Sequence, residues 1–125
     1  MTCKKKLIMS SRDKVIEYTL KKAWELNYKN ELDTSMKRFN QVFLFDPNNA
    51  DACFGFGIIS GKKGQIDEAI KYLHKALELA PENAEIIYNL GFSYSRKSYN
   101  KDLSQTKKID ALKNTVKYFE YAKKF

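Results

Sequence analysis

The chain has 125 residues, 43% of them hydrophobic and 14% aromatic, which suits one domain with a buried core and excludes a wholly disordered protein. Five glycines and two prolines are too few for a β protein built on tight turns, so the composition favours an all-α fold. No stretch approaches about 18 apolar residues, so no membrane-spanning helix is expected.

The positive charge of the chain is concentrated at its two ends. Lys and Arg number 23 against 15 Asp and Glu, a net charge of +8. Residues 1–14 hold five bases and one acid, residues 96–125 hold nine bases and three acids, and the intervening chain holds nine bases and eleven acids. Basic surfaces can bind nucleic acid or anionic lipid, but a solvated helix face is the better interpretation of these ends.

The first segment, residues 1–12, is expected to be a basic arm that precedes a single domain over residues 13–125. A basic run is followed by only three apolar residues, Leu7, Ile8 and Met9, whereas a secretory signal needs about 7–15. A cytoplasmic location is therefore expected, or the bacterial envelope if a leader is missing from the sequence.

The next two segments repeat each other with a period of 34 residues. Pro47 and Pro81 are one period apart, and the small residues Ala23, Gly57 and Gly91 recur at the same step. In residues 66–79 the apolar positions recur at steps of three and four, which indicates one buried helix face. A fixed period of this length is typical of a solenoid of stacked helix pairs.

This pattern resembles the tetratricopeptide repeat (TPR) family, whose unit is a 34-residue helix–turn–helix. Residues 50–83 fit best, with Gly57, Ala69, Ala76 and Pro81 at the family's small and proline positions, while Cys53 stands where the family usually has Trp. Residues 33–57 are similar to small bacterial TPR proteins of unassigned activity, several of them envelope lipoproteins. The resemblance implies an α-α superhelix of three helix pairs, with repeats at about 16–49, 50–83 and 84–125.

The third repeat departs from the 34-residue register. In strict register its second helix would bury Lys107 and Asp110, so we expect an insertion within residues 96–108. A shift of twelve puts Thr115, Phe119 and Ala122 in the core, and Leu112 and Val116 are expected to complete the buried stripe. The six helices are then predicted at 12–28, 31–45, 50–63, 66–79, 83–98 and 107–124.

A binding surface is implied by the resemblance, because TPR proteins usually bind their partners on the concave face lined by the first helix of each pair. The matching positions form the predicted partner groove: Leu20, Trp24, Tyr28, Phe54, Ile58, Lys62, Tyr88, Phe92 and Arg96. Its centre is apolar or aromatic, Lys62 and Arg96 form a basic edge, and Glu17, Asp51 and Glu85 form an acidic one. The alternative is that the amino-terminal arm or a second copy covers these residues.

One known TPR specificity is absent from this sequence. Chaperone-binding members grip a terminal carboxylate with basic and amide side chains. The matching positions here hold other residues: Leu20, Trp24, Gly55, Glu85 and Asn89. No carboxylate clamp for chaperone tails is therefore expected.

Catalytic and metal sites are not expected either. Cys3 and Cys53 are fifty residues apart and His74 is the single histidine, whereas a zinc site needs about four ligands. No set of residues suggests catalysis, and His74, beside Lys75, is expected to face solvent. We therefore expect no cofactor and no enzyme activity.

The function expected from sequence is a non-enzymatic protein-interaction module, a scaffold or adaptor. Its groove would bind a peptide or amphipathic helix of another protein, or a second copy of this chain. The alternative is a nucleic-acid or anionic-membrane surface binder that uses the Lys-rich termini.

Overall fold

The computed structural model describes residues 10–125, and that part of the chain contains helices and no strand. The helices are α2 (Ser11–Tyr28), α3 (Leu32–Phe45), α4 (Ala50–Lys62), α5 (Ile66–Leu79), α6 (Ala84–Ser98) and α7 (Gln105–Ala122). The six predicted helices are confirmed, with ends that differ by at most two residues. The proposed basic arm falls mainly on residues 1–9, which lie outside the described part.

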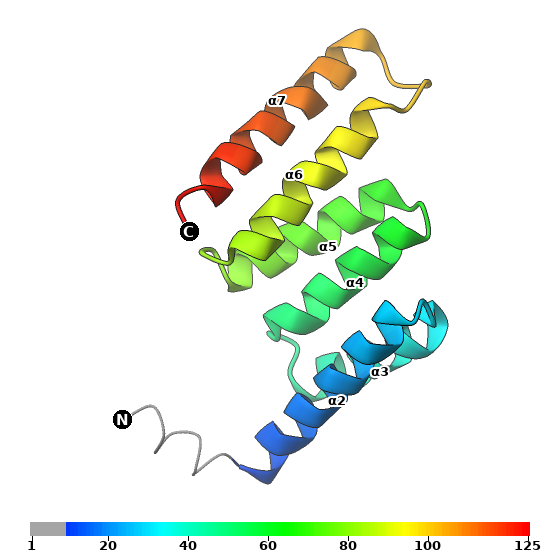
Figure 1. The fold of residues 1–125 in the computed structure, drawn as a ribbon, viewed down its shortest axis with the longest axis vertical. Helices are drawn as coiled ribbons and strands as arrows, with labels where there is room; N and C mark the ends of the chain where they lie inside the picture. The colour runs from blue at the N-terminus through cyan, green and yellow to red at the C-terminus, as the bar shows by residue number, and fades with distance from the viewer. Residues whose placement is uncertain (1–9) are drawn as a thin grey trace.

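The helices form three antiparallel pairs that stack from α2 at one end of the molecule to α7 at the other (Figure 1). The densest packing is within the pairs α2–α3, α4–α5 and α6–α7, and the second helix of each pair then packs on the first helix of the next. The all-α superhelix of three helix pairs, which the family resemblance implied, is confirmed.

Local signals explain where the helices begin and turn. Four helices start after a residue whose side-chain oxygen accepts a backbone N–H of the first turn: Ser10, Asn49, Asn83 and Ser104. The turns inside the first two pairs each contain a left-handed residue, Asn30 with φ 62° and Gly64 with φ 80°. These two positions are one period apart, so the same backbone turn recurs.

Small residues allow the two helices of a pair to approach closely. A Cβ atom added to Gly57 would lie 2.9 Å from Cγ of Leu73, and one added to Gly91 would lie 2.7 Å from Cδ1 of Phe119. Both distances are too short for real atoms, so each glycine is required by packing. The pairing of Gly91 with Phe119 also confirms the shift of twelve residues in the third repeat.

The insertion is divided between a longer loop and a longer helix. The loop 99–104 joins α6 to α7 inside the predicted range 96–108. Helix α7 begins ten residues before Thr115, whereas α5 begins three residues before the equivalent Ala69. Most of the inserted residues therefore extend α7 at its amino-terminal end.

One sequence expectation about the last helix is wrong. Leu112 and Val116 were expected in the core but are 50% and 61% exposed. Ala111, Thr115 and Tyr118 are the buried residues of α7, because they face α6. Leu112 and Val116 point to the side where, among the described residues, no further helix packs.

The main core lies between α4, α5, α6 and α7, and it includes Phe54, Leu73, Ile87, Leu90 and Tyr118. A second cluster joins the first two pairs around Phe39 and Phe56. None of the described helices has the length and apolarity needed to cross a lipid bilayer.

Candidate functional site

The first helices of the three pairs surround a hollow of about 230 Å³. Its lining comes from α2, α4 and α6: Trp24, Tyr28, Asp51, Phe54 and Glu85. The ring centroids of Trp24 and Phe54 lie 5.4 Å apart, and those of Trp24 and Tyr28 lie 6.4 Å apart. The structure thus brings three residues of the predicted partner groove together with two carboxylates.

Trp24 is held in place by the core beneath it. Its ring meets Phe39 of α3 edge-on, with centroids 4.8 Å apart and an interplanar angle of 77°. Phe54 is only 4% exposed, so it forms the floor of the hollow rather than a projecting anchor. Tyr28, at the end of α2, is 80% exposed and forms the rim. The hollow is therefore rigid at its base and open at one edge.

The other apolar positions of the predicted groove divide into two kinds. Leu20 and Ile58 are half-buried and pack against the core clusters. Tyr88 and Phe92 of α6 are 55% and 48% exposed, and they extend the apolar surface beyond the hollow. The Tyr88 ring also stacks on Phe119 of α7, with centroids 5.2 Å apart, which fixes its orientation.

Lys62 and Arg96 join successive first helices. Nζ of Lys62 lies 2.6 Å from Oδ1 and 3.1 Å from the carbonyl oxygen of Asn27, and Nη1 of Arg96 lies 3.0 Å from the carbonyl oxygen of Gly61. Each contact spans 35 residues, so the same link recurs between neighbouring repeats. The sequence analysis predicted only that these two residues form a basic edge. Their spacing of one period was the signal that both make the same contact with the preceding repeat.

One side of the hollow is negatively charged. Asp51 at the start of α4 and Glu85 at the start of α6 both line it, and desolvation raises the pKa of Asp51 above its ordinary value. A partly desolvated carboxylate gains by pairing with a cation. The site is suited to a ligand that combines an apolar side chain with a basic group.

His74 is half-buried, not solvent-exposed as expected. Its Nε2 lies 2.8 Å from the hydroxyl oxygen of Tyr94, and its ring meets both Tyr94 and Tyr118 edge-on. Burial and the charge of Lys117 lower the pKa of His74, while Glu78 acts in the opposite direction. The histidine joins α5 to α6 and α7, and its aromatic partners lie 20 and 44 residues away, so no local pattern indicated it.

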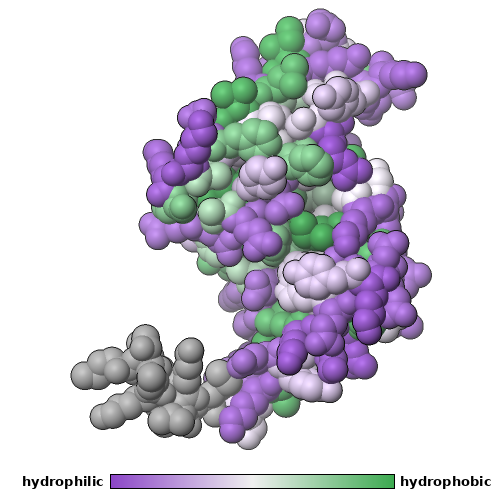
Figure 2. All heavy atoms as spheres, in the orientation of Figure 1, coloured by the Kyte–Doolittle hydropathy of each residue, from purple (hydrophilic) through white to green (hydrophobic). Residues whose placement is uncertain are grey.

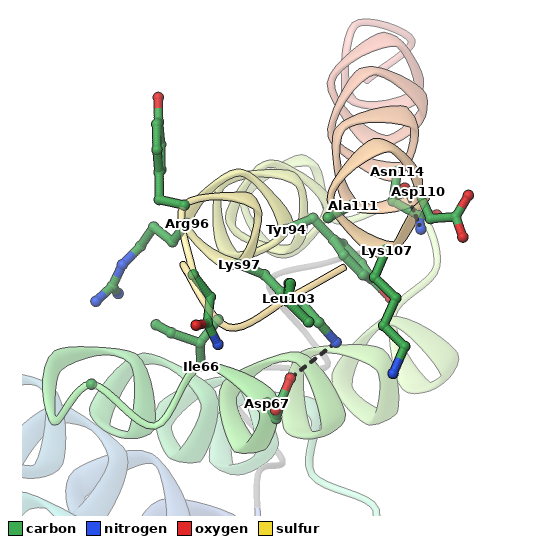
Figure 3. Close-up of a pocket in the computed structure, with 13 residues that line it drawn as sticks. Ile66, Asp67, Tyr94, Arg96, Lys97, Leu103, Lys107, Asp110, Ala111 and Asn114 are labelled. Atoms are coloured by element: carbon green, nitrogen blue, oxygen red, sulfur yellow. Dashed lines mark hydrogen bonds and ion pairs between the residues drawn. The ribbon is translucent and has the colours of Figure 1, made fainter. Parts of the chain in front are cut away.

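A larger hollow of about 740 Å³ opens beside the inserted loop (Figure 3). Lys97 of α6 reaches across to Asp67 of α5, with Nζ and Oδ1 3.0 Å apart, and Lys107 extends from α7 toward the same side. The lining mixes both charges with Tyr94, Leu103 and Ala111. Among the described residues, no group of three or more His, Cys, Asp or Glu side chains could hold a metal ion.

The comparisons with known proteins agree with this architecture. The family model described as TPR repeat matches residues 59–98, which run from the end of α4 to the end of α6. A mutant O-GlcNAc transferase from Thermobaculum terrenum is similar in structure, with a TM-score of 0.69 and 22% identity over 89% of this chain and 20% of that one. MamA has a TM-score of 0.66 and 16% identity over 88% of this chain and 61% of its own.

A MamA RS-1 ArsTM double mutant has a TM-score of 0.50 and 17% identity over 92% of this chain and 76% of that one. The chain spans about a fifth of the transferase and about three fifths of MamA, and at these identities the likeness concerns the fold alone. No curated protein matches the sequence.

Proposed function

We propose that this chain, in which residues 59–98 match the TPR repeat, is a non-enzymatic protein-interaction module. Its partner would be a peptide or amphipathic helix of another protein, bound on the face formed by α2, α4 and α6. The observation that supports this most directly is the hollow in which Trp24, Tyr28 and Phe54 meet two carboxylates.

The aromatic rings suit the anchoring of a single apolar side chain of the partner. Aromatic residues contribute strongly to binding when they sit in a preformed, well-packed pocket. Trp24 is already immobilised against Phe39, so little conformational entropy would be lost when a ligand covers it. Tyr88 and Phe92 would then contact the partner further along the face.

The carboxylates supply the polar part of the recognition. Asp51 and Glu85 flank the aromatic floor, so a Lys or Arg next to the anchoring side chain would be bound with charge complementarity. We therefore propose a partner segment in which a basic residue neighbours a Leu, Met or aromatic residue.

The proposal can be tested with peptides selected from a random displayed library against the full chain. We expect the selected peptides to pair an apolar with a basic residue, and Tyr28→Ala to weaken their binding about tenfold in calorimetric titrations. The double variant Asp51→Asn/Glu85→Gln should weaken binding most at low salt, since it removes a charge attraction.

The matched control is Tyr18→Ala, which removes another exposed tyrosine of α2 that does not line the hollow. Equal affinities of the Tyr18 and Tyr28 variants would contradict the proposed site. Selected ligands that are acidic and bind the Lys-rich ends with steep salt dependence would instead support the electrostatic alternative.

A further inference from the structure

Helix α7 presents an apolar stripe on the side away from α6, where no other helix of residues 10–125 packs. Ile109, Leu112 and Val116 are 43%, 50% and 61% exposed, and with Lys113 they line a shallow hollow of about 360 Å³. In Figure 2 hydrophobic residues reach the surface over α7 at the upper end of the molecule. This stripe is separate from the face formed by α2, α4 and α6.

The repeat shows what normally covers such a stripe. In the register set by Thr115 and Ala69, Leu112 and Val116 of α7 correspond to Ile66 and Ile70 of α5. Those two isoleucines pack in the core together with residues of α6. In the interior of the stack this position is therefore covered by the first helix of the following pair.

At the opposite end of the stack, the outer face of α2 carries a charged pair where α4 carries apolar residues. In α4 the residues one period after Tyr18, Lys22 and Glu25 are buried: Ala52, Phe56 and Ile59. In α2 Nζ of Lys22 instead lies 3.5 Å from Oε2 of Glu25 and 5.5 Å from the centre of the Tyr18 ring. Solenoid ends need polar capping, and among the described residues Lys22 and Glu25 supply part of it at the α2 end, beside the exposed Val15 and Tyr18.

The charge on α7 indicates which kind of helix could pack on its apolar stripe. Successive pairs are joined by the ion pairs Lys63–Asp33 at 2.6 Å and Lys97–Asp67 at 3.0 Å, which are one period apart. The residue of α7 equivalent to Asp67 is Lys113, so the charge at this contact is reversed. An incoming helix would have to place an acidic residue at the position that Lys63, directly after α4, and Lys97 of α6 occupy.

We propose that the stripe on α7 binds an acidic amphipathic α-helix of a partner protein, in the place of the first helix of a fourth pair. The partner's apolar face would cover Ile109, Leu112 and Val116, and its carboxylates would face Lys113 and Lys117. Copies of this chain fit less well: Lys29, which directly follows α2, occupies the critical position, and α7 itself is basic. Residues 1–9 contain three lysines and no acid, so they do not complement Lys113 either.

The test uses two stapled helical peptides that copy residues 84–98, one native and one with Lys97→Glu. We expect the Glu peptide to bind the full chain about fivefold more tightly than the native peptide, a ratio typical of an exposed charge contact. Lys113→Glu in the full chain should reverse that preference. Leu112→Ser/Val116→Ser should weaken both peptides at least tenfold, while circular dichroism confirms that the helices are retained.

Further measurements separate this surface from the other one and decide whether a partner helix, a second copy or residues 1–9 cover the stripe. Tyr28→Ala should leave peptide binding unchanged, which separates this surface from the one in the proposed function. Equal binding of the two peptides to the wild-type and Lys113→Glu chains would overturn the proposal. A concentration-dependent dimer of the wild-type chain that Leu112→Ser/Val116→Ser abolishes would also overturn it, since a second copy would then be the occupant. Tighter peptide binding after removal of residues 1–9 would overturn it in favour of the chain's own arm.

Discussion

His74 illustrates how a single residue can take a role that its neighbours in the sequence do not indicate. It stands beside Lys75 in the sequence, yet in the structure it packs edge-on against two tyrosines and shares a hydrogen bond with Tyr94. Leu112 illustrates the reverse, since its apolar side chain and helical spacing suggested burial, but it is half exposed. In both cases the deciding factor is which helix lies opposite.

The lowered pKa of His74 predicts a loss of stability in mild acid. The unfolded chain protonates this histidine near its ordinary pKa of about 6.5, whereas the folded chain resists protonation. The free energy of unfolding should therefore fall as the pH drops from 7.5 to 5.5, by at most about 1.4 kcal/mol per pH unit. Urea unfolding at several pH values, followed by the fluorescence of the single tryptophan, measures this slope.

His74→Gln provides the control, because glutamine can keep a hydrogen bond to Tyr94 but does not titrate. Its slope over the same pH range should be flatter than that of the wild type. Identical slopes for both proteins would show that His74 does not contribute to the acid sensitivity.

At the scale of the helices, the period of 34 residues governs the contacts between repeats as well as the helices themselves. Lys62 to Asn27 and Arg96 to Gly61 are one recurring link, and Lys63–Asp33 and Lys97–Asp67 are another. Helix positions were predictable because caps, turns and apolar spacing are local. The contacts between repeats were not predictable from the sequence, because a lysine on a solenoid surface can face either solvent or the preceding helix.

The two links should differ in their contribution to stability. Lys62 donates to Asn27, which is 2% exposed and whose amide nitrogen has no partner among the described residues. Lys62→Met would leave the side-chain oxygen unsatisfied as well, so we expect a loss of about 1–2 kcal/mol in the free energy of unfolding. The adjacent variant Lys63→Met loses only a pair to the exposed Asp33, which solvent screens, so it should destabilise the chain less than Lys62→Met.

Urea unfolding of the two variants, measured side by side, checks this order. Both substitutions remove one positive charge from the same end of α4, so they are matched in net charge. A larger loss for Lys63→Met than for Lys62→Met would contradict the structural role given to Lys62.

At the scale of the whole molecule, the stack has unequal ends. The helix α4 buries nine of its thirteen residues, because it has a pair on each side, whereas α7 buries three of eighteen. The outer face of α2 carries the pair Lys22–Glu25 beside Tyr18, whereas that of α7 exposes Ile109, Leu112 and Val116.

The difference in burial between the central and the terminal helices predicts the order in which their backbone amides exchange hydrogen. In a solenoid each repeat is stabilised by its neighbours, so the amides of α4 and α5 should exchange most slowly. The extension of α7 that precedes Ala111 should exchange faster, because it packs on few residues. Native-state exchange followed by NMR provides the measurement, and slowest exchange in α7 would contradict the assignment of α4–α5 as the stable centre.

Local patterns in the sequence determined the helices, the pairs and the register, including the shift in the third repeat, because those depend on spacing and on small residues at fixed positions. The family resemblance implied which positions line the face of the first helices, since a repeat places equivalent residues alike. Only the tertiary structure decided that Trp24 and Phe54 share a hollow with Asp51 and Glu85, and that Leu112 and Val116 stay uncovered. The reason is physical: burial of a helix face depends on whether another helix packs there, and no pattern within the helix contains that information.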